Sequence, residues 1–168
     1  MQYLPRRLYR LQKVCTTMIE MSIINIVFDK IYVVSMEKNV ERHKYINELF
    51  KEYGIVNYNI LHGPEGESID VNELYDKKLI ENHMKKMPNP IGTIETHKMA
   101  WQDLVNSGCK NCIVFEDDVY FLDNFETRLR KFLTNLPDNW DVLQIGWLPP
   151  HYSNKNDKKI NEYVKLRW

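Results

Sequence analysis

The feature that most constrains the fold is an alternation of short apolar runs with amphipathic stretches. The apolar runs, which predict strands, cover residues 31–35, 55–61, 112–115 and 141–145. The amphipathic stretches, which predict helices, cover residues 41–53, 70–84, 93–107 and 124–133. Such alternation predicts an α/β fold, with a mostly parallel sheet and helices on both faces. Ligands of such sheets bind beyond the carboxyl ends of the strands.

Small and polar residues predict where the helices begin and end. Gly54 and Gly108 are natural helix stops, and Asp70 can cap the helix that follows it. Residues 87–90, Met-Pro-Asn-Pro, predict a loop.

The spacing of the 93–107 helix predicts its buried face. This face would hold Ile94, His97, Trp101 and the pair Leu104 and Val105. Trp101 is then a core residue rather than a platform on which a ligand stacks. His97 is either a core histidine bonded to a backbone carbonyl or a residue that contacts substrate.

The composition indicates one globular domain of ordinary content. The chain has 168 residues, and its 23 basic residues balance 23 acidic ones. A formal net charge of zero argues against a protein that binds nucleic acid by charge alone. Three cysteines make no disulfide framework, so a reducing, cytoplasmic location is the simpler interpretation. Cys109 and Cys112 lack the second pair that a zinc site needs.

The N-terminal residues 1–28 are expected to be an extension that need not belong to the fold. Basic residues alternate there with leucines, which indicates either a membrane-surface or targeting helix or a segment upstream of the true start. The most apolar stretch, Met18–Phe28, contains Glu20 and Asn25. No transmembrane segment is therefore expected, since a span needs about 20 apolar residues.

Glu116, Asp117 and Asp118 follow the strand at 112–115 directly. Three adjacent carboxylates repel one another, and a divalent cation would remove that conflict. Mg²⁺ and Mn²⁺ favour carboxylate oxygen, and Mg²⁺ uses one or two carboxylates together with substrate phosphates. The pattern predicts a metal-diphosphate site; the alternative is a solvated acidic turn in which Asp118 or Asp123 caps the next helix.

Four stretches together resemble glycosyltransferase family 25, the family of lipooligosaccharide and procollagen galactosyltransferases. In chain order they are residues 31–42 (IYVVSMEKNVER), 92–101 (GTIETHKMAW), 114–119 (VFEDDV) and 140–146 (WDVLQIG). The resemblance covers about two-thirds of the chain. Thr96 stands where the family pattern has serine.

The resemblance implies a GT-A-like, Rossmann-type fold over residues 29–168 and a metal-dependent transfer of a hexose with inversion. It implies a UDP-sugar donor, typically UDP-galactose, a glycan or protein acceptor, and Mn²⁺ or Mg²⁺. Asp118 is then the first metal-ligand candidate, followed by Glu116 and Asp117. Ser35, Arg42 and His97 are the donor-binding candidates; the alternative for Arg42 is a solvated helix arginine.

The resemblance also implies that the C-terminal half of the domain is incomplete. Lys165–Trp168 resembles the strand just before a Gly-Thr-His-x-Tyr-like segment, and the sequence then stops. No catalytic base is assigned; Asp141 and His151 are weak candidates. The alternatives are an inactive remnant or one piece of a transferase that a second chain completes. A Mg²⁺-dependent phosphoryl-transfer domain is disfavoured, because no glycine-rich loop follows the first strand.

Overall fold

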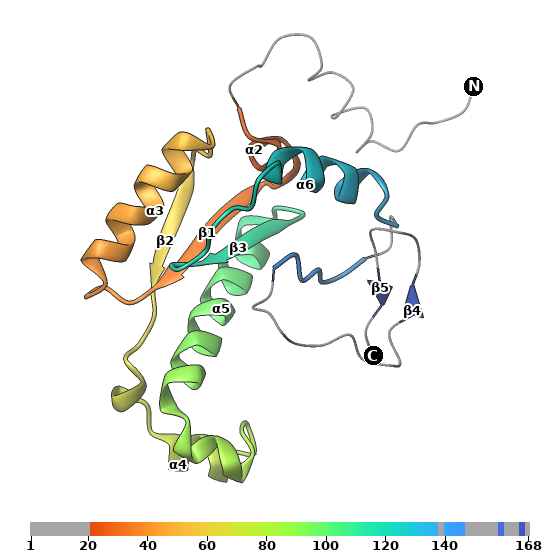
Figure 1. The fold of residues 1–168 in the computed structure, drawn as a ribbon. Coiled ribbons are helices and arrows are strands. Elements are labelled where there is room, and N and C mark those ends of the chain that lie inside the picture. Colours follow the sequence, from red (N-terminus) through yellow and green to blue (C-terminus); the bar gives the residue numbers. More distant parts are fainter. Residues whose placement is uncertain (1–20, 138–139, 147–157, 160–164, 167–168) are drawn as a thin grey trace. The chain divides into compact units, whose positions relative to one another are not determined.

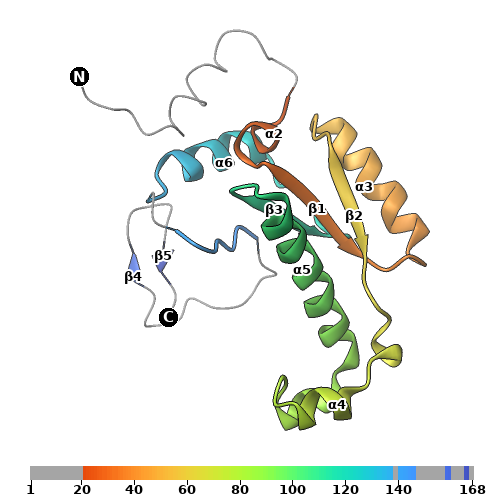
Figure 2. The same ribbon diagram turned by 180° about the vertical axis from the view of Figure 1, so that it is seen from behind.

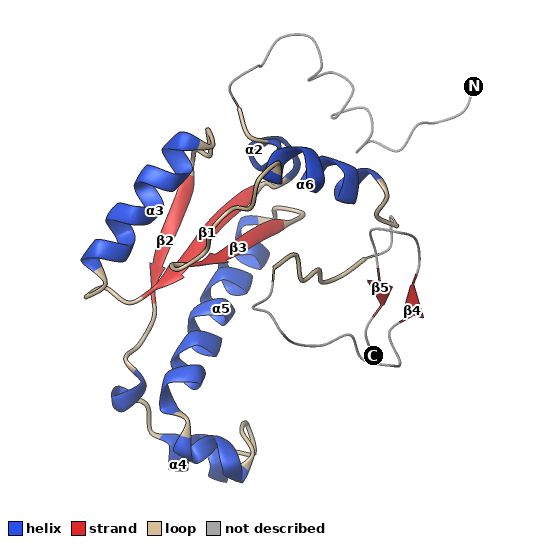
Figure 3. Cartoon of the chain, in the orientation of Figure 1, coloured by secondary structure: helices blue, strands red, loops and turns tan. Residues whose placement is uncertain are grey.

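A parallel three-stranded sheet is the centre of the computed structural model (Figures 1 and 3). The structure describes residues 21–137, 140–146, 158–159 and 165–166. In the sheet, β1 (Lys30–Ser35) lies between β2 (Tyr58–His62) and β3 (Cys112–Glu116). This α/β, Rossmann-like arrangement confirms the predicted fold class.

The chain divides into two units between Tyr120 and Phe121. The first unit contains the sheet and most of the helices. The second contains α6 (Phe125–Thr134) and the antiparallel pair β4 (Lys158–Lys159) and β5 (Lys165–Leu166).

Helices α3 (Val40–Glu52) and α5 (Pro88–Ser107) cover opposite faces of the sheet, as the two views show (Figures 1 and 2). On the α3 face, the Phe50 ring packs against the rings of Tyr58 and Phe115 in edge-to-face arrangements. The ring centroids are 4.8 Å apart for Tyr58 and 5.3 Å apart for Phe115. On the α5 face, the buried Tyr32 hydroxyl donates a hydrogen bond to Asp103 of α5. Each face of the sheet therefore has its own anchoring contact.

The loop after β2 lies directly against α5. A Cβ added at Gly63 would lie 1.7 Å from Thr96 Oγ1, and one added at Gly92 would lie 2.8 Å from the Pro64 carbonyl oxygen. The backbones can approach this closely because both glycines lack a side chain. The N-terminal half of α5 is fixed against the sheet edge as a result.

The predicted buried face of α5 is wrong. Ile94, Trp101 and Val105 are 43%, 53% and 72% exposed, and the buried residues are instead Ile91, Gly92, Thr96 and Ala100. The close approach of the loop after β2 requires small residues at the contact, so the largest apolar side chains face outward. The helix also begins at Pro88, inside the predicted loop, because proline is tolerated in the first turn.

Several predicted boundaries also shift. Asp70 caps a helix as predicted, accepting bonds of 3.0 Å from the Asn72 and Glu73 amides. That helix, α4 (Val71–Asp76), is short, and the short 3₁₀ helices η2 (Gly66–Ser68) and η3 (Asn82–Lys86) flank it. The predicted strand at 141–145 is wrong, since those residues form no strand and Val142 is 87% exposed.

The first described element belongs to the fold, although the sequence suggested that residues up to 28 need not. Helix α2 (Ile23–Val27) has three buried apolar side chains, and the Asn25 amide donates to the Gly54 carbonyl at 2.7 Å. Residues 1–20 lie outside the described residues. Among the described helices, none has the length and apolar content needed to cross a bilayer.

Candidate functional site

The carboxyl ends of the three strands bring distant polar residues to one sheet edge. Ser35 ends β1 and lies beside His62, which ends β2. Val33 is paired with Phe115, two residues before Asp117. Because side chains alternate along a strand, Ser35, His62 and Asp117 all point toward the α3 face, and Glu116 points the other way.

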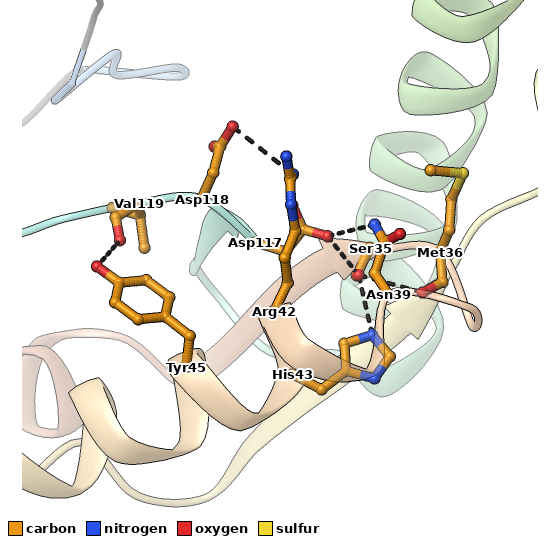
Figure 4. A network of polar contacts seen from close by, with 9 residues as sticks. All are labelled: Ser35, Met36, Asn39, Arg42, His43, Tyr45, Asp117, Asp118 and Val119. Atoms are coloured by element: carbon orange, nitrogen blue, oxygen red, sulfur yellow. Dashed lines mark hydrogen bonds and ion pairs between the residues drawn. The ribbon is translucent and has the colours of Figure 1, made fainter.

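Helix α3 meets this edge with Asn39, Arg42 and His43, whose spacing places them on one side of the helix. Their side chains converge on Asp117 and Ser35 (Figure 4). We call Ser35, Asn39, Arg42, His43 and Asp117 the Asp117 cluster.

Both oxygens of the Asp117 carboxylate are engaged. Arg42 Nη1 donates to Oδ1 at 2.5 Å. Oδ2 accepts from Ser35 Oγ at 2.5 Å and from Asn39 Nδ2 at 2.9 Å. Asp117 is only 5% exposed, so these bonds replace nearly all of its hydration.

The donors keep Asp117 ionised inside the fold. Burial alone raises the pKa of its carboxyl, but the bonds from Ser35, Asn39 and Arg42 outweigh burial and bring the pKa below its ordinary value. The same hydrogen bond raises the pKa of Arg42. The carboxylate also lies near the N-terminus of α3, where the helix dipole favours a negative charge.

The hydrogen bonds of Ser35 indicate which ring nitrogen of His43 carries a hydrogen, namely Nε2. The Ser35 hydroxyl has one hydrogen, which it donates to Asp117, so its oxygen accepts from His43 Nε2 at 2.9 Å. A serine, a histidine and an aspartate thus meet, but not in the order of a hydrolase triad. There the carboxylate orients the histidine and the histidine takes the serine proton. Here the carboxylate holds the serine proton, and Ser35 is only 8% exposed.

Glu116 and Asp118 are the exposed acids at this edge. Asp118 Oδ2 lies 3.7 Å from Arg42 Nη1, and its side chain is 62% exposed. The turn that holds both acids is closed by a bond from the Val119 amide to the Glu116 carbonyl at 3.2 Å. The Tyr45 hydroxyl donates to the Val119 carbonyl at 3.0 Å, which ties the turn to α3 (Figure 4).

These positions bear on how the edge could hold a divalent cation. No three acidic, histidine or cysteine side chains gather around one point in the described part of the chain. Asp117 has its oxygens occupied, which leaves Glu116 and Asp118 as candidate ligands. One or two carboxylates suffice for Mg²⁺ when substrate phosphates supply further oxygens, so the two exposed acids meet that requirement in number.

The three predicted donor-binding residues separate into two places. Ser35 and Arg42 come together in the Asp117 cluster, where Arg42 is ion-paired rather than simply solvated. His97 lies on α5, across the sheet, with its ring 6.0 Å from the ring of Trp101 between centroids. It is half-buried, not a core residue.

Sequence reasoning missed Asn39, His43 and His62. The signal was present in part, because 39, 42 and 43 share a helix face. Strand alternation would also have separated Asp117 from Glu116. What was missing was the register that brings His62 beside Ser35.

Comparison with known proteins decides the family. The family model described as glycosyltransferase family 25 (LPS biosynthesis protein) matches residues 28–167. The chain belongs to glycosyltransferase family 25.

The individual proteins that match this chain either share low sequence identity with it or match only part of it. Procollagen galactosyltransferase 2 of Homo sapiens is 21% identical over 133 residues, which are 71% of this chain and 21% of the relative. The probable inactive glycosyltransferase 25 family member 3 of Rattus norvegicus is 34% identical over 59 residues, 33% of this chain and 10% of the relative. The procollagen lysyl hydroxylase and glycosyltransferase of Acanthamoeba polyphaga mimivirus is 33% identical over 97 residues, 52% of this chain and 11% of the relative. The chain thus spans between about a tenth and a fifth of these curated relatives.

Proposed function

We propose that this family 25 chain binds a UDP-sugar together with Mn²⁺ or Mg²⁺ and transfers its hexose to a glycan or protein acceptor. The hexose proposed is galactose, and the transfer inverts the configuration of its anomeric carbon. The observation that carries the proposal is the pair of exposed acids at the carboxyl end of β3, Glu116 as its last residue and Asp118 in the turn that follows, in a domain that matches the family. This pair stands at the carboxyl edge of a parallel sheet, where ligands of such sheets bind.

In this proposal, Asp118 and Glu116 hold the cation and the Asp117 cluster holds the turn that presents them. The ion would supply positive charge that stabilises the departing diphosphate. Arg42 reaches both Asp117 and Asp118, so it fixes the angle between the turn and α3. Ser35 keeps its hydroxyl on Asp117, and its role is to shape the edge rather than to attack the sugar.

A thermal-shift measurement tests the proposal. Mn²⁺ together with uridine diphosphate at about 100 times its Kd should stabilise the fold by about 2.7 kcal/mol. For a chain of this size that is a rise in Tm of about 5–10 °C. Asp118→Ala should abolish the part of the Tm rise that depends on Mn²⁺. Asp123 is also an exposed acid, so the matched variant Asp123→Ala should retain the whole rise. An unchanged Tm, or an equal rise in Asp118→Ala, would contradict the metal site.

A second candidate is a binding domain without transferase activity. The relative from Rattus norvegicus is named as a probable inactive member, and this favours the alternative. Transfer also needs a base within hydrogen-bond reach of the acceptor hydroxyl. Of the two weak candidates, Asp141 is exposed and His151 lies outside the described residues. Donor hydrolysis and transfer assays on protein that binds the donor distinguish the two: product formation supports the enzyme, and binding without turnover supports the alternative.

A further inference from the structure

His62 has a feature that the proposed site does not use. Its ring is stacked on that of His43, with centroids 5.2 Å apart and planes inclined by 3°. The His62 side chain is exposed, whereas His43 is half-buried. His43 stacks on one face of the His62 ring, so a ligand that stacks on His62 would use the opposite face.

The Asp117 cluster holds this stack in place. His43 Nε2 bonds to Ser35 Oγ, and Ser35 is bound to the buried Asp117, so the His43 ring has a fixed plane. His62 is the last residue of β2, and the Gly63 amide after it donates to the Ser35 carbonyl at 2.9 Å. An exposed ring with a fixed orientation loses little side-chain entropy when a planar ligand stacks on it.

His62 lies at a distance from the candidate metal ligands that a nucleoside diphosphate can span. β2 and β3 flank β1, so their carboxyl ends lie two strand spacings apart, about 10 Å. The candidate metal ligands lie at the carboxyl end of β3, and His62 ends β2. A diphosphate held beside Glu116 and Asp118, with its nucleoside directed along the sheet edge toward β2, would bring its base near His62.

We propose that the outward face of His62, supported by His43, is the stacking surface for the base of the nucleotide-sugar donor. This inference rests on the proposed function and assigns a donor-binding role to His62. Aromatic side chains stack on bases through their faces, and such stacking tolerates any base because every base has a π-face. The contact is then a property of the ring and should survive replacement by another aromatic residue.

The test measures the Kd of uridine diphosphate and of inorganic pyrophosphate, each with Mn²⁺, by calorimetry on the full chain. His62→Ala should weaken uridine diphosphate by about fivefold or more and leave pyrophosphate unchanged. His62→Phe should bind uridine diphosphate about as well as the unmodified chain. His83→Ala is the matched control, because His83 is an exposed histidine on η3, and it should change neither Kd.

Each other result has a distinct meaning. If the unmodified chain binds uridine diphosphate and His62→Ala binds it equally well, the stacking role is wrong and the proposed function stands. If His62→Ala weakens both ligands equally, or His62→Phe loses as much as His62→Ala, the histidine acts through its ring nitrogens rather than through the face of its ring, and stacking is again wrong. If the unmodified chain binds neither ligand, the proposed function fails and takes this inference with it. Imidazole NMR signals of His62 in the unmodified chain, which should shift with uridine diphosphate but not with pyrophosphate, give a readout that needs no variant.

Discussion

Removing the carboxylate of Asp117 should destabilise the fold strongly. Asp117→Ala leaves three donors without their acceptor: Ser35 Oγ, Asn39 Nδ2 and Arg42 Nη1. A hydrogen bond to a charged group contributes about 1.5–3 kcal/mol. The Arg42 side chain is 52% exposed and can regain water, so its share is discounted. Ser35 is only 8% exposed, and its one other acceptor among the described contacts is the Met36 carbonyl, at 3.3 Å. We therefore expect a loss of about 2–4 kcal/mol in the free energy of unfolding.

Urea denaturation measures this loss, with a neighbouring acid as the control. Asp118→Ala removes a carboxylate whose side chain is 62% exposed and whose distance from Arg42 is 3.7 Å. An exposed ion pair contributes less than about 1 kcal/mol, so this variant should unfold almost like the unmodified chain.

A double-mutant cycle adds a second check. Asp117→Ala and Arg42→Ala should be less than additive together, because both remove the same bond. Equal losses in Asp117→Ala and Asp118→Ala would refute the reasoning, since they would mean that burial of Asp117 and its three donors has no energetic consequence.

Three further predictions concern the rest of the first unit. Burial, together with the bond to Asp103, raises the pKa of the Tyr32 hydroxyl well above its ordinary value of about 10. Stability from that group is present below pH 10 and is lost as the pH rises further, so urea midpoints should fall less steeply above pH 10 in Tyr32→Phe than in the unmodified chain. Gly63→Ala should lower the free energy of unfolding by about 1–3 kcal/mol, because the new Cβ overlaps Thr96 Oγ1. In a chain that already carries Thr96→Ala, the further loss from Gly63→Ala should be smaller. An equal loss would show that the overlap is not the cause. Trp101→Gln should change the free energy of unfolding by less than about 1 kcal/mol, since Trp101 is 53% exposed. Ile91 is buried, so Ile91→Ala should lower the free energy of unfolding by about 2–5 kcal/mol. A loss that large in Trp101→Gln would mean that Trp101 is a core residue after all.

The three strands of the parallel sheet and the acidic edge could be predicted from the sequence because they depend on local patterns. The β-branched run of β1 and the apolar run before Glu116 identify two strands without tertiary information. Gly108 has a φ of 66°, so its role as the helix stop was also a local property. The α5 face was predicted wrongly because periodicity selects large apolar residues, whereas the contact with Gly63 requires Thr96 and other small ones.

The sequence by itself determined that this chain forms strands alternating with helices and places three acids directly after the apolar run at 112–115, since those features follow from the order of neighbouring residues. Only the tertiary structure decided what each acid does. Strand register and the position of α3 turn Asp117 inward, to Ser35, Asn39 and Arg42, and leave Asp118 exposed in the turn. The physical reason is that adjacent residues of an extended chain face opposite sides, so three acids in a row share a sequence but not an environment.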